Sequence, residues 1–227
     1  MQHLLVSPSL TNTYQFFTKF DSEQSVREKG LDKLIKLLVT DKYWVSQPTD
    51  KYLRVIWEGL FFSKSSIKRL ILDVVFWHAD KSQYQRETSL KIAGIMTNLP
   101  GPTSEEANAR KKAWFEACLY ILNKHWHKVD NFRIDKFLAL LRHMFSQALT
   151  FIKSGEYAQI DLDWFEQLLQ KTLTDPKSSQ GIALHICDIF IPELGKIDSK
   201  DISLHNLSGL LKPFLTSLAK SSSQMVQ

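Results

Sequence analysis

The chain has 227 residues, which is long enough for one large domain or two small ones with a sizeable core. Only 8 glycines and 7 prolines accompany 44% hydrophobic residues, and this composition favours helices over a turn-rich all-β fold. The net charge of +5 suits a polyanionic partner. Many nuclear and cytosolic proteins carry such a modest excess, so the charge by itself does not indicate nucleic acid.

The cysteine pattern and the hydropathy predict a soluble intracellular protein with no membrane partner. Cys118 and Cys187 lie far apart in apolar surroundings and form no Cys-x-x-Cys pair, which predicts buried thiols in a reducing compartment. The first residues, MQHLLVSPSL, lack the charged and apolar regions of a signal peptide. No window reaches the roughly 18 apolar residues of a membrane span.

Apolar residues recur at helical spacing along almost the whole chain, and no convincing pair of strands is present. Asp21, Thr49 and Ser104 offer helix caps, and the stretches SQPTD, NLPGP, KSGEY and TDPKSS offer breaks. A short aromatic segment near residues 13–20 comes first. The predicted helices then cover about 21–38, 49–61, 67–77, 83–99, 104–127, 130–153, 161–174, 179–195 and 205–218. The last is expected to be bent or restarted at Pro213.

About eight to ten helices joined by short loops predict an all-α fold of sequential antiparallel hairpins, either HEAT-like or an irregular α-solenoid. No fixed sequence period is present, so any repeats are structural. The NLPGPTSEE break is too short to be a linker. We therefore expect a single domain over residues 12–220, between a flexible N-terminus (1–11) and a flexible tail (221–227).

The stretch DNFRIDKFLALLRHMF, residues 130–145, combines large apolar side chains with basic ones. On a helix, Arg133, Lys136 and His143 cluster opposite a core face, as a solvated basic back or as a ridge that binds phosphate or a partner. Phe137 and Phe145 belong to the core face, so they do not support base stacking. That face spans an arc of about 140° and comprises Met144, Phe137, Ala148, Leu141, Ile134, Phe145, Leu138 and Leu149.

Other candidate sites carry weaker signals. Arg110, Lys111 and Lys112 are either a nuclear-import or phosphate-contact signal or the charged first turn of an exposed helix. His125 and His127 lie on different faces of a helix, so they cannot bind one metal together there. No catalytic or phosphate-loop motif is present, and we predict no catalytic, metal or cofactor site and no small-molecule substrate.

Five segments follow one another in a recognisable order: SEQSVREKGLDKLIKLL, VIWEGLFF, VDNFRIDKFLALLRHMFSQALTFIK, SSQGIALHICDIFIPELGKI and GLLKPFLTSLAKS. The third follows Trp126 and begins R-x-D-K-F, through Arg133, Asp135, Lys136 and Phe137. In this order and spacing the segments resemble the eukaryotic ribosomal RNA processing protein 1 family. The resemblance covers roughly residues 15–221.

The resemblance implies a nucleolar, non-enzymatic assembly factor of the large (60S) ribosomal subunit, needed for maturation of precursor rRNA. Its implied partners are pre-60S assembly factors and the precursor rRNA itself. A phosphate-binding ridge would bind less tightly as salt rises. We predict that changing Arg133 and Lys136 to glutamate reduces association with pre-ribosomes and leaves the helicity intact.

Two departures from the family pattern stand out. Residues 63–75 stand between two segments that follow each other almost directly in the family. They are either an insertion that extends a helix or a gene-model error. Many members also carry a long basic C-terminal extension, which has no counterpart in these 227 residues. Two alternatives stay open. One is a general HEAT-like adaptor without RNA contact, and the other is a helical-repeat DNA-repair glycosylase, for which Asp135 is the acid to test.

Overall fold

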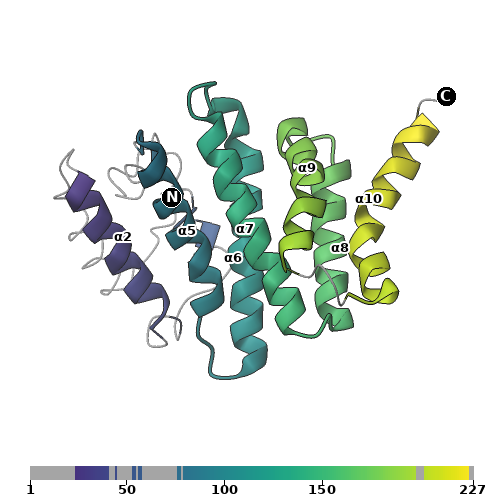
Figure 1. Ribbon diagram of the computed structural model, residues 1–227, viewed down its shortest axis with the longest axis horizontal. Coiled ribbons are helices and arrows are strands. Elements are labelled where there is room, and N and C mark those ends of the chain that lie inside the picture. Colours follow the sequence, from purple (N-terminus) through teal and green to yellow (C-terminus); the bar gives the residue numbers. More distant parts are fainter. Residues whose placement is uncertain are drawn as a thin grey trace, which may run out of the picture.

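A computed structural model of the chain describes residues 24–40, 44, 53–54, 56–57, 76–77, 79–197 and 202–224, and this part is helical without a strand (Figure 1). Its helices are α2 (Gln24–Leu38), α5 (Ser82–Asn98), α6 (Ser104–His125), the 3-10 turn η2 (Trp126–Lys128), α7 (Ile134–Ser154), α8 (Gln159–Thr174), α9 (Gln180–Ile197) and α10 (Leu204–Gln224). The predicted all-α fold is confirmed.

The helices from α5 to α10 form two layers in which the chain alternates. In one layer α5 contacts α7 and α7 contacts α9, and in the other α8 contacts α10. Phe115 of α6 packs on Trp164 of α8, with the ring centroids 6.1 Å apart, so α6 belongs to the second layer. Successive helices are antiparallel hairpins, with α2 at one end of the row and α10 at the other (Figure 1). This arrangement confirms an α-solenoid-like domain.

Helix α7 occupies the centre of the core. Six members of its predicted core face are buried, and the remaining two, Ile134 and Leu138, are partly exposed. The ring of Phe145 contacts those of Phe115, Phe165 and Phe190, so one α7 side chain joins α6, α8 and α9. The inward orientation predicted for its aromatic residues is therefore confirmed.

Two helix starts differ from the sequence prediction. Thr103, not Ser104, caps α6: its backbone is extended and its hydroxyl accepts from the Glu106 amide at 3.2 Å. Asp130 does not begin α7 but forms a turn, because its carboxylate accepts from the amide of Phe132 and its carbonyl from that of Arg133. The turn delays the helix to Ile134.

Three later boundaries also shift. Helix α8 begins at Gln159, before the predicted Asp161. Glu156 and Tyr157 lead into it with positive φ angles of 53° and 57°, a conformation that stops α7. Helix α9 continues to Ile197, and α10 continues through Pro213 to Gln224, so the expected domain boundary at residue 220 falls inside a helix.

The two cysteines have different environments. Cys118 is buried, as predicted, but Cys187 is exposed on the outer side of α9, between the exposed Leu184 and Ile191. An apolar sequence around a residue does not guarantee burial when the helix has no neighbour on that side. Several predictions lie outside the described residues: the segment near 13–20, most of the helices expected at 49–61 and 67–77, the inserted segment 63–75 and the flexible residues 1–11.

Candidate nucleic-acid interface

Lys136, the central residue of the predicted basic ridge, is buried. Only 4% of the residue is exposed, and its ammonium donates to the carbonyl of Trp77 and, at 3.1 Å, to that of Ala79. Burial lowers the pKa of Lys136 to about 8, and the Arg133 charge acts in the same direction. The sequence placed Lys136 on a solvated back, and the structure corrects this placement. The back of α7 is covered at this point by the chain at Trp77 and Ala79.

Arg133 is half-buried and engaged with its neighbours. It forms an ion pair with Asp130, and its guanidinium lies over the Trp77 ring, 4.6 Å from the centroid. Because its side chain is held by both Asp130 and Trp77, Arg133 stabilises the turn before α7. The pair Arg133 and Lys136 therefore braces the chain, and glutamate at both positions is expected to disturb the fold, contrary to the sequence-based expectation of intact helicity.

His143 also faces a neighbouring helix and not open solvent. Its Nδ1 lies 2.8 Å from the hydroxyl oxygen of Ser89, a buried residue of α5. Burial lowers the pKa of His143, and the cations Arg86, Arg142 and Lys196 lower it further, against the opposing charge of Glu193. The three residues do not form a continuous solvated ridge, because α5 packs against this side of α7.

The basic cluster at residues 110–112 splits up in the same way. Arg110 is buried, donates to the carbonyl of Pro100 at 2.5 Å and lies over the Trp44 ring. Lys112 pairs with the buried carboxylate of Asp161 at 2.6 Å. Lys111 is partly exposed beside Gln147 of α7. A role of these residues in binding RNA or a partner stays a prediction, which Lys111 suits best.

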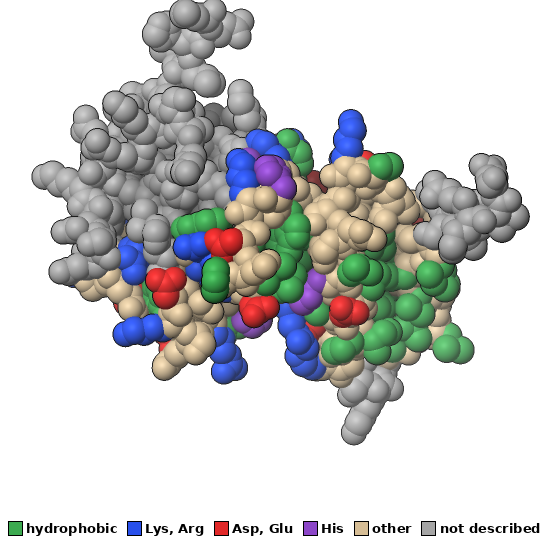
Figure 2. Space-filling view, turned by 90° about the horizontal axis from the view of Figure 1, so that it is seen from above, with side chains coloured by type: hydrophobic (Ala, Val, Ile, Leu, Met, Phe, Trp, Pro, Cys, Tyr) green, Lys and Arg blue, Asp and Glu red, His purple; other side chains and the backbone are tan. Residues whose placement is uncertain are grey.

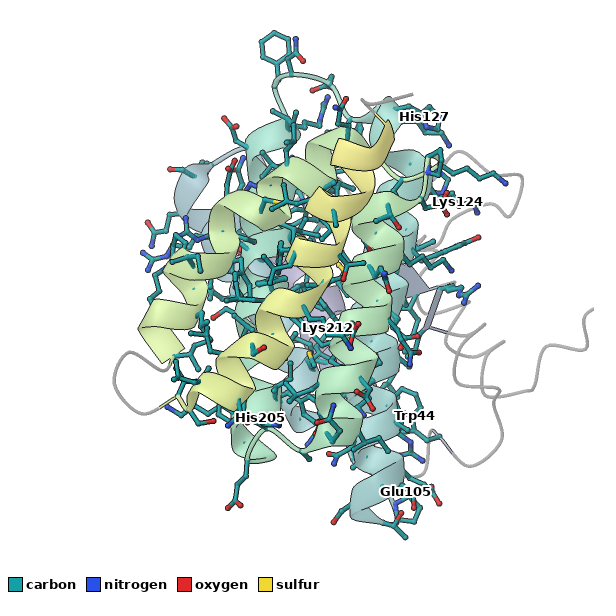
Figure 3. All side chains as sticks on the ribbon, turned by 90° about the vertical axis from the view of Figure 1, so that its right-hand side faces the viewer. Trp44, Glu105, Lys124, His127, His205 and Lys212 are labelled. Atoms are coloured by element: carbon teal, nitrogen blue, oxygen red, sulfur yellow. The ribbon has the colours of Figure 1, made fainter. Side chains whose placement is uncertain are left out.

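The structure brings a different set of cations together, at the end of the helices where α6 meets α7 and α8 meets α9. Lys124, His127 and Lys128 are exposed at the end of α6 and in η2, and Lys177 is exposed in the turn after α8. Lys124 and His127 lie near the same end in Figure 3, and Figure 2, which looks onto this end, shows Lys, Arg and His side chains across it with some Asp and Glu side chains among them. We call these four residues the basic edge.

Two contacts join the loops that carry the basic edge. The Ser179 amide donates to the Asn123 side chain at 2.8 Å, which ties the turn after α8 to the end of α6. The Trp126 indole lies against Gly181: a Cβ on this glycine would be 3.0 Å from the indole nitrogen. The sequence does not reveal this edge directly, because Lys177 is distant in sequence from the other three residues of the edge. The order of the helices could have indicated it, because every second loop in a row of antiparallel helices lies at the same end of the row's helices.

The described residues contain neither a cluster of three potential metal ligands nor a helix able to cross a membrane. The other histidines and carboxylates with displaced pKa values have structural partners. His185 lies 3.0 Å from the Leu138 carbonyl oxygen, and burial lowers its pKa. Burial alone would raise the pKa of Glu193, but hydrogen bonds from Lys196 and Arg142 outweigh it and lower the pKa.

Comparison with known proteins identifies the family. The family described as "Nucleolar protein, Nop52" matches residues 12–227. The chain belongs to the Nop52 family. A fruit-fly (Drosophila melanogaster) protein named ribosomal RNA processing protein 1 homolog is 28% identical over 171 residues, covering 75% of this chain and 22% of that protein.

Two more relatives of this Nop52 family chain have similar names. The human ribosomal RNA processing protein 1 homolog A is 24% identical over 209 residues, 90% of this chain and 41% of its own length. The Dictyostelium discoideum homolog is 27% identical over 194 residues, 76% of this chain and 35% of its own length. The chain thus spans less than half the length of these relatives. The family resemblance is confirmed, and the expected nucleolar location agrees with the family description.

The segments that carry the Nop52 family resemblance contact one another. Trp126, before the third segment, packs on Gly181 in the fourth. Arg142 of the third forms an ion pair with Glu193 of the fourth. The Phe190 ring of the fourth lies 4.5 Å from that of Phe214 in the fifth. These segments therefore hold adjacent helices of the solenoid together, which explains their residue types without any contact to RNA.

Proposed function

We propose that this chain is the helical domain of a ribosome biogenesis factor that serves as a non-enzymatic scaffold in large-subunit (60S) precursors, where it is needed for processing of precursor rRNA. Its partners are pre-60S assembly factors and the precursor rRNA. The observation that carries the proposal is the family match over residues 12–227, with relatives named for ribosomal RNA processing.

The architecture supports a scaffold. A row of paired helices offers two long side surfaces and two sets of loops, and each can hold a different partner. The groups that an enzyme would use are engaged in packing: Lys136 with backbone carbonyls, His143 with Ser89 and Glu193 with two cations. Asp135, which a glycosylase mechanism would need in a basic cleft, is an exposed residue of the first turn of α7. An acid there stabilises the helix by its interaction with the dipole.

The proposal is tested in cells depleted of the full-length protein. Restored expression is expected to return precursor rRNA of the large subunit to its normal level, and the tagged protein is expected to sediment with large-subunit precursors. The matched control is an identically tagged unrelated helical-repeat protein. Sedimentation with small-subunit precursors, or normal processing in depleted cells, would refute the role.

A second candidate function is a general HEAT-like adaptor that binds proteins and does not touch RNA. It is favoured by exposed apolar side chains on the last two helices: Leu184, Ile191, Leu204, Leu215 and Leu218. Crosslinking in cells separates the two functions. Recovery of rRNA fragments crosslinked to this protein supports direct RNA contact, and recovery of assembly factors without crosslinked RNA supports the adaptor.

A further inference from the structure

The outer side of α9 carries a row of exposed apolar residues. Leu184 and Ile191 are each 60% exposed, and Cys187 is exposed between them. On a helix these three residues fall within an arc of about 60°. Glu193, which pairs with Arg142 of α7, lies about 160° around the helix from Ile191. The row of apolar residues therefore points away from α7.

Helix α10 carries a matching row. Leu204, Leu215 and Leu218 are 85%, 60% and 68% exposed, and they also fall within an arc of about 60°. The opposite side of α10 packs on α8: Gly209, which lies against Leu162, is about 180° around the helix from Leu218. This second row therefore points away from α8.

The two rows form one apolar surface at the end of the solenoid, which we call the α9–α10 face. The rings of Phe190 and Phe214 join its two helices. Figure 3 looks onto this end with α10 in front, and Figure 2 shows hydrophobic side chains gathered over it. Five of the nine exposed large hydrophobic residues in the described part of the chain belong to the face, so it is a patch and not the usual scatter. A solenoid end that meets solvent has a polar outer side, so an apolar one indicates a partner.

The packing within the solenoid indicates that this partner is a helix. Helix α7 lies between α5 and α9, with one neighbour on each side (Figure 1). Helix α9 has α7 on one side and the row of Leu184, Cys187 and Ile191 on the other. Gly195 ends this row, and a Cβ on it would meet nothing within 4 Å, so the backbone of an added helix can approach closely there. A helix on the α9–α10 face would continue the row of α5, α7 and α9.

The charges around the α9–α10 face indicate which kind of helix fits it. Lys196 and Lys212 each pair with a glutamate, at 2.7 and 2.8 Å, so these cations are already neutralised and do not favour the phosphates of RNA or lipid. Asp188 is exposed next to Cys187. A two-fold contact with a second copy, centred on this row, would bring two Asp188 carboxylates together, and like charges oppose that contact. A different protein with a cation at this point is favoured.

We infer that the α9–α10 face docks an amphipathic helix of another protein, which places apolar residues three and four apart against the two rows and a lysine or arginine against Asp188. The inference rests on the proposed function, because it names the surface by which the scaffold holds a protein partner. In recognition of this kind the apolar anchors supply most of the affinity, and a charge at the rim adds selectivity.

The first test places the photo-crosslinking residue benzoylphenylalanine at position 215 of the full-length protein in cells and sequences the crosslinked peptides. The expected product is a segment of another protein with apolar residues three and four apart and a neighbouring lysine or arginine. The matched control carries the same crosslinker at position 90, where Leu90 of α5 is 46% exposed, and is expected not to yield this segment. Crosslinks from position 215 to a second copy, to RNA or to lipid, or no more protein than from position 90, would overturn the inference.

The second test measures how the crosslinked segment, made as a synthetic peptide, binds the purified full chain. Bound peptide is expected to slow maleimide labelling of Cys187, since Cys118 is buried. Leu184→Ala with Ile191→Ala is expected to weaken binding at least about tenfold, as loss of apolar anchors does. Leu90→Ala should bind like the parent chain. All these side chains are exposed, so the fold is expected to stay intact, which circular dichroism verifies.

A charge reversal tests the contact with Asp188. Asp188→Lys is expected to weaken binding of the peptide about 2- to 5-fold, and a peptide with glutamate in place of its cation should recover the loss. Unchanged affinity in Leu184→Ala with Ile191→Ala, or equal losses with both peptides in Asp188→Lys, would contradict the inference.

The proposed function fails separately. A chain that sediments with large-subunit precursors but gives no helical segment from position 215 refutes only the docking surface. A chain that binds such a helix but never enters those precursors refutes only the scaffold role.

Discussion

At the scale of single residues, Lys136 belongs to the segment that carries the family resemblance and has a structural role in the interior of the protein. Its ammonium has two backbone carbonyls as acceptors and a position over the Phe76 ring at 6.0 Å, in a place where only 4% of the residue meets solvent. A cation there fixes the chain at Trp77 and Ala79 against α7. The residue type is explained by carbonyl oxygens that need a donor.

Lys136→Glu is expected to lower the free energy of unfolding by about 3 kcal/mol or more, because it places a buried carboxylate against two carbonyl oxygens. Urea unfolding monitored by circular dichroism measures the change. Lys177→Glu, the same change at an exposed position, is expected to stay within about 0.5 kcal/mol of the parent chain. Equal effects of the two substitutions would contradict the buried position of Lys136.

The depressed pKa of Lys136 predicts a pH dependence with a definite sign. Between about 8 and the ordinary value of 10.5, the unfolded chain holds this proton and the folded chain does not. The free energy of unfolding from this group therefore rises with pH across that window, and the gain is lost as the pH falls through about 8. Lys136→Met removes the titration. The stability difference between the parent chain and Lys136→Met should then shift in favour of the parent from pH 7 to pH 10, and a flat or opposite trend would contradict it.

At the scale of elements, α7 and α9 are joined by a buried carboxylate. Glu193 has a side chain that is 4% exposed and accepts from Arg142 of α7 and, at 2.7 Å, from Lys196 of its own helix. The two hydrogen bonds keep the carboxylate ionised although burial opposes the charge. This pair crosses between two of the segments that carry the family resemblance.

Arg142→Met is expected to lower the free energy of unfolding by about 2 kcal/mol, since Glu193 then keeps only one cation in a buried site. The double change Arg142→Met with Glu193→Leu is expected to be closer to the parent chain than Arg142→Met, because no buried charge is left unpaired. Lys91→Met, which breaks an exposed pair with Asp32, serves as the control and should cost at most about 0.5 kcal/mol. The coupling would be contradicted if the double variant lost as much stability as the single variants Arg142→Met and Glu193→Leu lose together.

The helix α9 offers a further comparison within one element. A Cβ on Gly195 would meet nothing within 4 Å, whereas a Cβ on Gly181 would lie 3.0 Å from the Trp126 indole nitrogen. Gly195→Ala is expected to raise the free energy of unfolding by about 0.5–1 kcal/mol through helix propensity. Gly181→Ala should lose this gain to the clash with a partly buried ring. Thermal unfolding of the two variants decides, and an equal rise in both would show that Trp126 does not constrain Gly181.

At the scale of the whole molecule, exposed cations and exposed acids occupy loops at opposite ends of the helices. The basic edge lies at one end, and Glu105, Glu106 and Glu156 lie at the other. Glu105 and Lys124 mark these opposite ends of α6 in Figure 3. We expect a phosphate backbone to bind at the loops that carry the basic edge, and protein partners to bind the side surfaces.

This charge distribution predicts the salt dependence of RNA binding. With three or four phosphate contacts, the affinity for a single strand should fall about 20- to 50-fold between 50 and 200 mM KCl. Lys128→Glu with Lys177→Glu should weaken binding and flatten the salt dependence. Lys29→Glu with Lys36→Glu, both exposed on α2, changes the net charge equally and should have a much smaller effect. Similar losses of RNA affinity in both double variants would show that binding depends on the net charge and not on the basic edge.

The sequence by itself determined the helical class, the order of the helices and the family. The apolar face of a helix is visible in the sequence as apolar residues at a regular interval, so the core face around Phe137 and Phe145 was predictable. Five segments in the right order were enough to indicate the family. The exact starts were less predictable, because Thr103 and Ser104 can both cap and only the backbone geometry selects one.

Only the tertiary structure decided which polar residues are exposed. A helical wheel has one solvated side, but α7 is flanked by α5, α6, α9 and the chain at Trp77 and Ala79. Lys136 and His143 are therefore enclosed on its nominal back. The basic edge depends on loops that folding brings to one end from distant parts of the chain. Phe132 is exposed because it lies in the turn that Asp130 forms before α7. The physical reason is common to these cases: periodicity records the preference of one helix, whereas exposure depends on all the neighbours that pack around it.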